Sequence, residues 1–160
     1  MSTEDAPPPK PIQIPGPYPH LLLVRAPYYR DIIDGMTEGA IGIMGKSGAT
    51  HSVLDVAGAF ELPQAIRLAL RGRRHYDAYI ALGCVVKGET DHYEFLCAAT
   101  MQGMMDVQLR YGIAIGTGLL TVATIEQAKA RSGPGKHNKG AEAAAAALMQ
   151  ISALRRLGSW

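Results

Sequence analysis

The chain has 160 residues, of which 48% are hydrophobic and 19% are charged, and its formal net charge is +2. A chain of this length is typical of one domain with a sizeable buried core. The nearly neutral balance lacks the basic stripe of a nucleic-acid-binding protein, and no apolar run approaches the roughly 18 residues of a membrane span, so we expect neither nucleic acid nor membrane as a partner.

The N-terminal segment is rich in proline. It has seven prolines in its first nineteen residues, and it carries Glu4 and Asp5 in place of the apolar core of a signal peptide. Proline-rich segments of this kind are extended or disordered. We therefore predict a flexible arm over residues 1–19 and a single domain over residues 20–160.

Short apolar runs alternate with segments of helical periodicity along the rest of the chain. In chain order they predict a strand at 20–24, a helix at about 32–44, a strand at 51–56, a helix at 61–73, a strand at 77–86, a helix at 92–111, a strand at 113–122, a short helix from Thr124 to Arg131 and a long helix capped by Asn138. Near-continuous apolar strands between helices predict an α/β fold whose parallel sheet is covered on both faces.

Polar and aromatic residues follow each predicted strand. The segments are "RAPYY", "AGAFELP", "KGETDH", and Thr121 with the short helix to Arg131. Ligands of parallel α/β sheets bind beyond the carboxyl ends of the strands. We therefore expect a ligand site where these four segments converge.

The third of these segments combines a tight turn with a helix start. After Gly88, the backbone N–H groups of Glu89 and Thr90 suit an anion such as phosphate, but an Asp or Thr cap of the following helix explains the same residues equally well. The P-loop motif G-x-x-x-x-G-K-[ST] is absent. His92 suits acid–base chemistry, because an ordinary pKa of about 6.5 allows both protonation states at neutral pH, and its plain alternative is a solvated ring at a helix start.

A metal site is not expected, because H-x-x-x-H and C-x-x-C spacings are absent and the other histidines are scattered, at His20, His51, His75 and His137. Cys84 and Cys97 have no histidine at a spacing typical of a thiolate nucleophile, so we expect them to pack in the core. Two cysteines make no disulfide framework, which favours a reducing, cytoplasmic setting.

Other strand-end residues each have a functional and a structural interpretation. Glu61 can accept hydrogen bonds from sugar-like hydroxyls or favour a helix start. Tyr28 and Tyr29 can stack on a planar ring or pack in the core. Arg131 and Lys139 flank a Gly/Pro loop and suit phosphate. Arg131 also suits a helix C-terminus, whereas the cation at Lys139 opposes the helix dipole, which favours a function for it.

Four segments together resemble the lumazine synthase (6,7-dimethyl-8-ribityllumazine synthase) family of riboflavin biosynthesis. They are "GAFELP" at 58–63, "ALGCVVKGETDHYEFLC" at 81–97, "GLLTVATIEQAKAR" at 118–131 and "NKGAEAA" at 138–144, in family order and spacing. The resemblance covers about residues 20–155. It implies a flavodoxin-like three-layer αβα sandwich with a four-stranded parallel sheet.

The resemblance also implies an activity. Members of the family are transferases that condense 5-amino-6-(D-ribitylamino)uracil with 3,4-dihydroxy-2-butanone 4-phosphate. The products are 6,7-dimethyl-8-ribityllumazine, phosphate and water, and the reaction is the penultimate step of riboflavin biosynthesis. It needs no metal and no organic cofactor.

Each position that matches the family motifs takes a role from the resemblance. His92 is similar to the acid–base histidine, Lys139 to a lysine of the same pocket and Glu142 to an acidic residue that orients the histidine. The butanone phosphate would be held by Glu89, Thr90 and Arg131. The pyrimidine and ribityl chain would be held by Tyr28, Ala59, Phe60, Glu61, Cys84, Val85, Val86 and Thr117.

The sequence departs from the family pattern at a few of these positions. Tyr28 aligns with the stacking aromatic, and Pro27 stands where an arginine is common. Thr117 replaces the phenylalanine of many members, and Glu89 replaces a small residue in the phosphate turn. These departures favour one alternative, a weakly catalytic paralogue that binds riboflavin or lumazine. A second alternative is a generic flavodoxin-like module that binds a phosphorylated ligand.

The resemblance finally implies an assembly. Family members form pentamers or multiples of pentamers with active sites between adjacent subunits. His92 and Glu61 would come from one chain, and Arg131 and Lys139 from the next. An association with riboflavin synthase is a further implied partnership.

Overall fold

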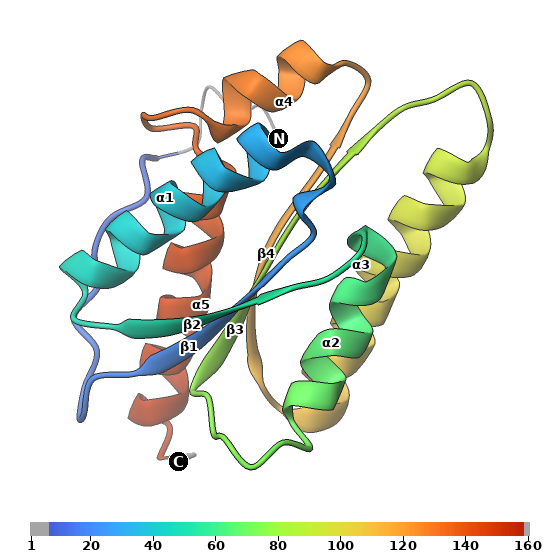
Figure 1. Ribbon diagram of the computed structural model, residues 1–160. Helices are drawn as coiled ribbons and strands as arrows, with labels where there is room; N and C mark the ends of the chain where they lie inside the picture. The colour runs from blue at the N-terminus through green and yellow to red at the C-terminus, as the bar shows by residue number, and fades with distance from the viewer. Residues whose placement is uncertain (1–6, 159–160) are drawn as a thin grey trace.

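The computed structural model describes residues 7–158, so the first six residues of the predicted arm and the last two residues of the predicted domain lie outside the described part. Strands and helices alternate as the sequence predicts (Figure 1). The elements are β1 (His20–Arg25), η1 (Pro27–Tyr29), α1 (Arg30–Lys46), β2 (Thr50–Asp55), η2 (Ala59–Glu61), α2 (Leu62–Ala69), β3 (Ala78–Val86), α3 (His92–Tyr111), β4 (Ala114–Val122), α4 (Ile125–Ser132) and α5 (Lys139–Arg156), where η1 and η2 are short 3-10 helices.

The four strands form one parallel sheet in the order β2-β1-β3-β4. Helices α1, α4 and α5 cover one face, and α2 and α3 cover the other (Figure 1). The predicted α/β fold, a three-layer αβα sandwich of the flavodoxin-like class, is therefore confirmed. Because all strands run the same way, their carboxyl ends share one edge of the sheet.

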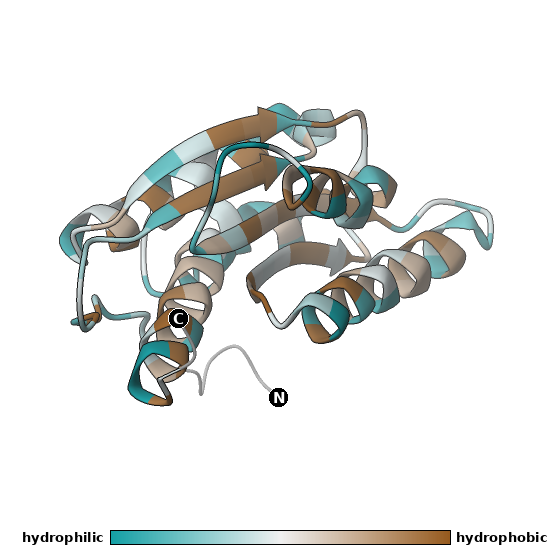
Figure 2. Ribbon diagram, turned by 90° about the horizontal axis from the view of Figure 1, so that it is seen from below, coloured by the Kyte–Doolittle hydropathy of each residue, from teal (hydrophilic) through white to brown (hydrophobic). Residues whose placement is uncertain are grey.

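Alternate residues of the central strands supply two cores. In β1, Leu21 and Leu23 face the layer of α1 and α5, whereas Leu22 and Val24 face the layer of α2 and α3. This follows from the two-residue repeat of a strand, and it explains why β1 is apolar without interruption. Figure 2 shows hydrophobic residues along the strands and mostly hydrophilic residues in the loops that connect them to the helices.

Helix α5 packs unusually close to the edge strand β4. Its buried residues are mainly alanines, at Ala141, Ala143, Ala144, Ala145 and Ala147. A Cβ added at Gly116 of β4 would overlap the carbonyl group of Ala143. Small side chains on both elements therefore set the distance between the helix and the sheet.

We expect Gly116→Ala to destabilise the protein by about 1–3 kcal/mol, because overpacking displaces backbone that has no room to move. The measurement is the free energy of unfolding from urea denaturation. Gly45→Ala is the matched control, because a Cβ at Gly45 meets nothing within 4 Å. Equal stability of the two variants would contradict this account of the packing.

Two predicted helix caps are confirmed, and one helix is shorter than predicted. Thr124 Oγ1 accepts from Gln127 N at 3.3 Å, and Asn138 Oδ1 accepts from Ala141 N at 3.0 Å. The helix predicted over 61–73 spans only Leu62–Ala69. Its end tightens into a turn in which Gly72 N donates to Ala69 O at 3.0 Å, so the last predicted residues leave the helical path.

Residues 7–19 lie against α1 and α5 without forming a helix or strand. Ile12 N donates to Ser47 Oγ at 3.0 Å. Arg155, which is only 8% exposed, donates from Nη1 to Pro15 O at 2.8 Å and to Pro17 O at 2.6 Å. These contacts hold the described part of the proline-rich segment on the surface of its own domain.

Candidate active site

A cleft of about 590 Å³ opens at the carboxyl edge of the sheet. Three of the four predicted strand-end segments meet in it: η1 after β1, η2 after β2, and the end of β3 with the start of α3. It is lined by Tyr28, Tyr29, Gly58, Ala59, Phe60, Glu61, Cys84, Val85, Val86, His92 and Leu96. Eight of the sequence-predicted residues therefore share one cavity, although they come from positions as far apart as Tyr28 and His92 in the chain.

Exposed aromatic rings form part of the wall. Tyr28 is 77% exposed and Phe60 is 58% exposed, which is unusual for rings of this size. The Tyr28 ring meets Tyr29 edge-on, with centroids 5.1 Å apart. Solvent-facing aromatic faces beside an apolar cavity offer a stacking surface for a planar heterocycle.

Glu61 places a free carboxylate in the cleft. Its backbone N donates to Gly58 O at 3.2 Å and so closes the short η2 turn. A Cβ added at Gly58 would lie 3.2 Å from Glu61 Oε2, so the glycine leaves room for the carboxylate. The carboxylate makes no hydrogen bond or ion pair to any residue between 7 and 158, and it can therefore accept from ligand hydroxyls.

The end of β3 presents unpaired backbone to the cleft. Pairing with β1 ends at Leu82, whereas pairing with β4 continues to Val86. Ala26 N still donates to Leu82 O at 2.9 Å, and beyond that point none of the described strands pairs with β3 on its β1 side. Because backbone groups alternate between neighbours, those of Cys84 and Val86 face the cleft without a strand partner. Such groups can read the edge of a heterocycle.

Cys84 lies in the cleft as a buried, neutral thiol. It is 6% exposed, and burial raises its pKa to about 11. The thiolate is the reactive form of cysteine, so this residue is no nucleophile at neutral pH. The predicted packing role of Cys84 is confirmed by its burial.

We expect iodoacetamide to alkylate Cys84 about 100-fold more slowly than a free thiol at pH 8, because a raised pKa keeps the thiol protonated. The rate should increase as the pH approaches 11, where the folded thiol ionises. Peptide mass mapping against time measures this rate, with a cysteine peptide as the control. Rapid labelling of Cys84 at pH 8 would show that the site is open and the thiol activated.

The turn before α3 leaves backbone donors free. Within the described chain, the N–H groups of Gly88, Glu89 and Thr90 donate no hydrogen bond, and all three residues are exposed. Helix α3 begins after the N-cap residue Asp91 without any side-chain cap hydrogen bond, so the alternative of an Asp or Thr cap is wrong. Free N–H groups at the N-terminus of a 20-residue helix suit an anion. His92 is the first residue of α3 and points into the adjoining cleft.

The remaining predicted residues do not line the cleft of their own chain. Thr117 is exposed in the middle of β4, opposite Ala81. Arg131 Nη1 donates to Gln127 O at 3.0 Å at the end of α4. Both α4 and α5 lie in the opposite helical layer from α3 (Figure 1). Consequently, within the described part of a single chain, no lysine or arginine lines the cleft.

Lys139 and Glu142 form a pair at the start of α5. Lys139 Nζ lies 2.5 Å from Glu142 Oε2. Glu142 Oε1 is buried and has no hydrogen-bond partner among the described residues. A buried carboxylate oxygen without a partner is rare in a complete structure, so this atom calls for a donor from outside the described chain.

Three residues of the cleft were not in the predicted set, namely Tyr29, Gly58 and Leu96. Tyr29 was considered beside Tyr28 as a ring that could stack on a ligand, and burial raises its pKa, so its hydroxyl stays a neutral donor. Leu96 lies one helical turn after His92, and this spacing could have predicted that both residues line the cleft. No signal in the sequence indicates that Gly58 lines the cleft, because its role depends on its contact with Glu61 in the folded chain.

Within residues 7–158, no group of three or more His, Cys, Asp and Glu side chains could hold a metal ion. None of the helices in that same part of the chain combines the length and the apolar character that crossing a membrane requires.

The fold and the cleft define an α/β protein of the flavodoxin-like class with a small-molecule site at the carboxyl ends of its parallel strands. The model of the 6,7-dimethyl-8-ribityllumazine synthase family matches residues 19–155, which is most of the chain. The chain belongs to this family.

Curated relatives agree over most of their length. The chain is 43% identical over 141 residues to 6,7-dimethyl-8-ribityllumazine synthase of Bartonella bacilliformis, covering 88% of this chain and 93% of the relative. It is 45% identical to 6,7-dimethyl-8-ribityllumazine synthase 1 of Rhodopseudomonas palustris, covering 86% of each chain. Identity to the synthase of Agrobacterium fabrum is 41%, covering 88% of this chain and 97% of that one.

Proposed function

We propose that the protein is a 6,7-dimethyl-8-ribityllumazine synthase. It condenses 5-amino-6-(D-ribitylamino)uracil with 3,4-dihydroxy-2-butanone 4-phosphate and releases phosphate and water. The observation that carries the proposal is the cleft, which joins an aromatic wall, a free carboxylate, unpaired strand backbone and His92 at one edge of the sheet. Family membership supplies the identity of the substrates.

The pyrimidine substrate fits the part of the cleft built by a single chain. Its ring stacks on Tyr28, and its edge meets the free backbone of Cys84 and Val86. The hydroxyls of the ribityl chain donate to the Glu61 carboxylate, which has no partner within the described chain. Phe60 and Ala59 cover the apolar side of the substrate.

The second substrate lies at the start of α3. Its phosphate accepts from the free N–H groups of Glu89 and Thr90, and the helix dipole favours the negative charge there. The amine of the pyrimidine forms an imine with the ketone, phosphate leaves by elimination, and the ring closes. His92 moves protons in these steps. Holding the two substrates in contact contributes much of the acceleration.

The site is completed by a neighbouring copy of the chain. Among the described residues, the lining of the single-chain cleft lacks the cation that a departing phosphate needs, and it includes neither Arg131 nor Lys139. Glu142 Oε1 needs a donor, and His92 of an adjacent chain supplies one. Thr117 is exposed on β4, and we place it at the same contact with the neighbouring chain.

An exposed apolar face on α3 supports a homo-oligomer. Phe95 is 73% exposed, Met101 48%, Met105 50% and Leu109 72%, so this helix carries large apolar side chains that the single chain does not cover. We propose a pentamer, or a multiple of pentamers, in which this face lies between subunits. A cytoplasmic setting and an association with riboflavin synthase belong to the same proposal.

The test is to mix the two substrates with purified protein and to follow the absorbance of the lumazine product. Product formation well above the uncatalysed rate supports the synthase. Tight quenching of riboflavin fluorescence without product would instead support the weakly catalytic binding paralogue. A monomer in light scattering that forms no product would favour a generic module for phosphorylated ligands.

A further inference from the structure

Helix α1 contains glycines at positions where alanine would favour the helix. An interior glycine costs a helix about 1 kcal/mol relative to alanine. A Cβ at Gly42 or Gly45 would meet nothing within 4 Å among residues 7–158, so packing within that part of the chain does not require glycine there. A Cβ at Gly35 would lie 2.5 Å from Ser132 O, and one at Gly39 would overlap the side chain of Asn138. Gly35 and Gly39 therefore form a socket for the last residue of α4 and for Asn138, which caps α5.

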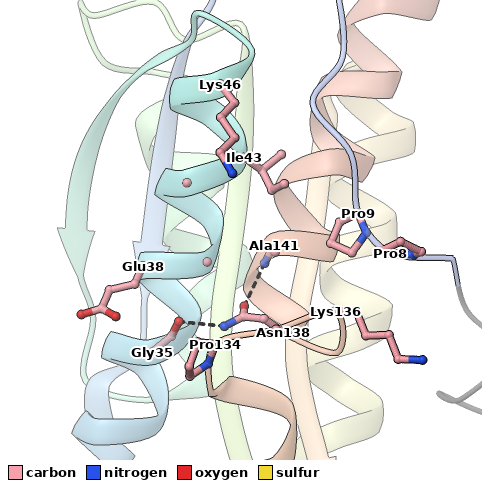
Figure 3. Close-up of a pocket in the computed structure, with 13 residues that line it drawn as sticks. Pro8, Pro9, Gly35, Glu38, Ile43, Lys46, Pro134, Lys136, Asn138 and Ala141 are labelled. Carbon is pink, nitrogen blue, oxygen red and sulfur yellow. Dashed lines mark hydrogen bonds between the residues drawn. The ribbon is translucent and has the colours of Figure 1, made fainter.

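Asn138 fills this socket with its side chain. It is only 3% exposed, and its Nδ2 donates to Gly35 O at 2.9 Å, to Ser132 O at 2.8 Å and to Gly133 O at 3.0 Å. Its Oδ1 accepts from Ala141 N at 3.0 Å. Figure 3 shows the side chain between α1 and α5, with the hydrogen bonds to Gly35 and Ala141 dashed. One amide thus connects α1, the end of α4 and the first turn of α5.

The residues next to these contacts are the proposed phosphate cations. Ser132 directly follows Arg131, and Asn138 directly precedes Lys139. A cavity of about 460 Å³ lies beside the socket, between α1 and the loop that contains Pro134 and Lys136. On that side the loop is therefore not held by close packing. The hydrogen bonds of Asn138 hold much of the loop in place.

We infer that Asn138 is a positioning residue for the butanone phosphate site. Through the socket of Gly35 and Gly39, it fixes Arg131 and Lys139 at a set distance from each other. The inference rests on the proposed synthase function. A displacement of about 1 Å in a binding group can lower a rate by up to two orders of magnitude, so this anchor matters although it touches no substrate.

A purely structural role for Asn138 makes a different prediction. Capping α5 needs only the Oδ1 acceptor, and aspartate caps helices as well as asparagine does. Anchoring the loop needs the Nδ2 donor, which aspartate lacks. Asn138→Asp would therefore leave the cap intact and set a carboxylate against three carbonyl oxygens.

The cleanest test changes neither charge nor any residue of the site. Gly39→Ala pushes on the Asn138 side chain, and Gly42→Ala is the matched control one turn later on the same helix. For Gly39→Ala we expect a KM for the butanone phosphate raised on the order of 10-fold, with little change in the KM for the pyrimidine. Gly42→Ala should match the unsubstituted chain. A structural role would lower the thermal midpoint without this split between the two KM values.

Equal KM values for the butanone phosphate in folded Gly39→Ala and Gly42→Ala would overturn the inference. If Gly39→Ala does not fold, Asn138→Asp replaces it, and an unchanged KM in that variant overturns the inference as well. An unsubstituted chain that forms no lumazine would overturn the proposed function instead. Calorimetric binding of inorganic phosphate to the same variants would then decide the role of Asn138, since weaker binding in Gly39→Ala than in Gly42→Ala supports it and equal binding rejects it.

Discussion

Replacing His92 with alanine is expected to lower kcat for lumazine formation by about 10- to 100-fold. General acid–base catalysis by one residue often contributes more than this, but holding two substrates together supplies a large share of the acceleration in a condensation. His92 is the histidine of the cleft and makes no hydrogen bond or ion pair within the described part of its own chain, so its loss removes proton transfer without removing a contact inside that chain. Steady-state kinetics at saturating concentrations of both substrates measures the effect.

The matched control is His75→Ala. His75 is an exposed histidine in the loop between α2 and β3, outside the cleft. This variant should retain full activity. An unchanged kcat in His92→Ala would remove His92 from the mechanism and would favour a site that acts by proximity alone.

Mixing two impaired variants should restore part of the activity. Arg131→Ala should raise the KM for the butanone phosphate by about 10- to 100-fold, because charge-assisted hydrogen bonds to a phosphate are strong. If His92 and Arg131 of one site come from different chains, co-assembly of His92→Ala with Arg131→Ala creates some sites with both side chains intact. Random mixing in equal amounts makes about one quarter of the sites complete in a ring of identical interfaces.

The experiment co-refolds the two variants and measures the rate at a butanone phosphate concentration below its KM. The control combines the same variants after separate folding, so that no subunits are exchanged, and its rate should equal the sum of the two residual activities. Lys129→Ala, an exposed cation on α4, should show no loss by itself. Failure of the co-refolded mixture to exceed the sum of its parts would place the whole site within one chain.

The order and type of the main helices and strands were predictable because each depends on a local pattern. The apolar run of β1 and the caps at Thr124 and Asn138 need only neighbouring residues to be recognised. The end of α2 was not predictable in the same way. Leu70, Arg71 and Arg73 favour a helix and Gly72 by itself is a weak stop signal, but the chain turns there to reach β3.

The segments that form the site were predictable from the sequence, but their arrangement in space was less so. Parallel strands bring their carboxyl ends to one edge, so the residues after β1, β2 and β3 were expected to converge, and they do. The strand-end pattern also predicted that Arg131 would converge with them, whereas the family resemblance placed Arg131 on the next chain. In the structure α4 lies in the opposite helical layer, and Arg131 does not line the cleft of its own chain. Sequence periodicity says that a helix is amphipathic, but it does not say which face of the sheet the helix covers.

By itself, the sequence determined the alternation of elements, the parallel sheet and the chemistry available at each strand end, because these follow from periodicity, turn residues and side-chain type. Only the tertiary structure decided that β3 extends beyond β1, which frees the backbone of Cys84 and Val86, and that two glycines of α1 receive Asn138. The physical reason is that register and close approach between distant segments arise from the packing of the whole domain, and no local pattern records them.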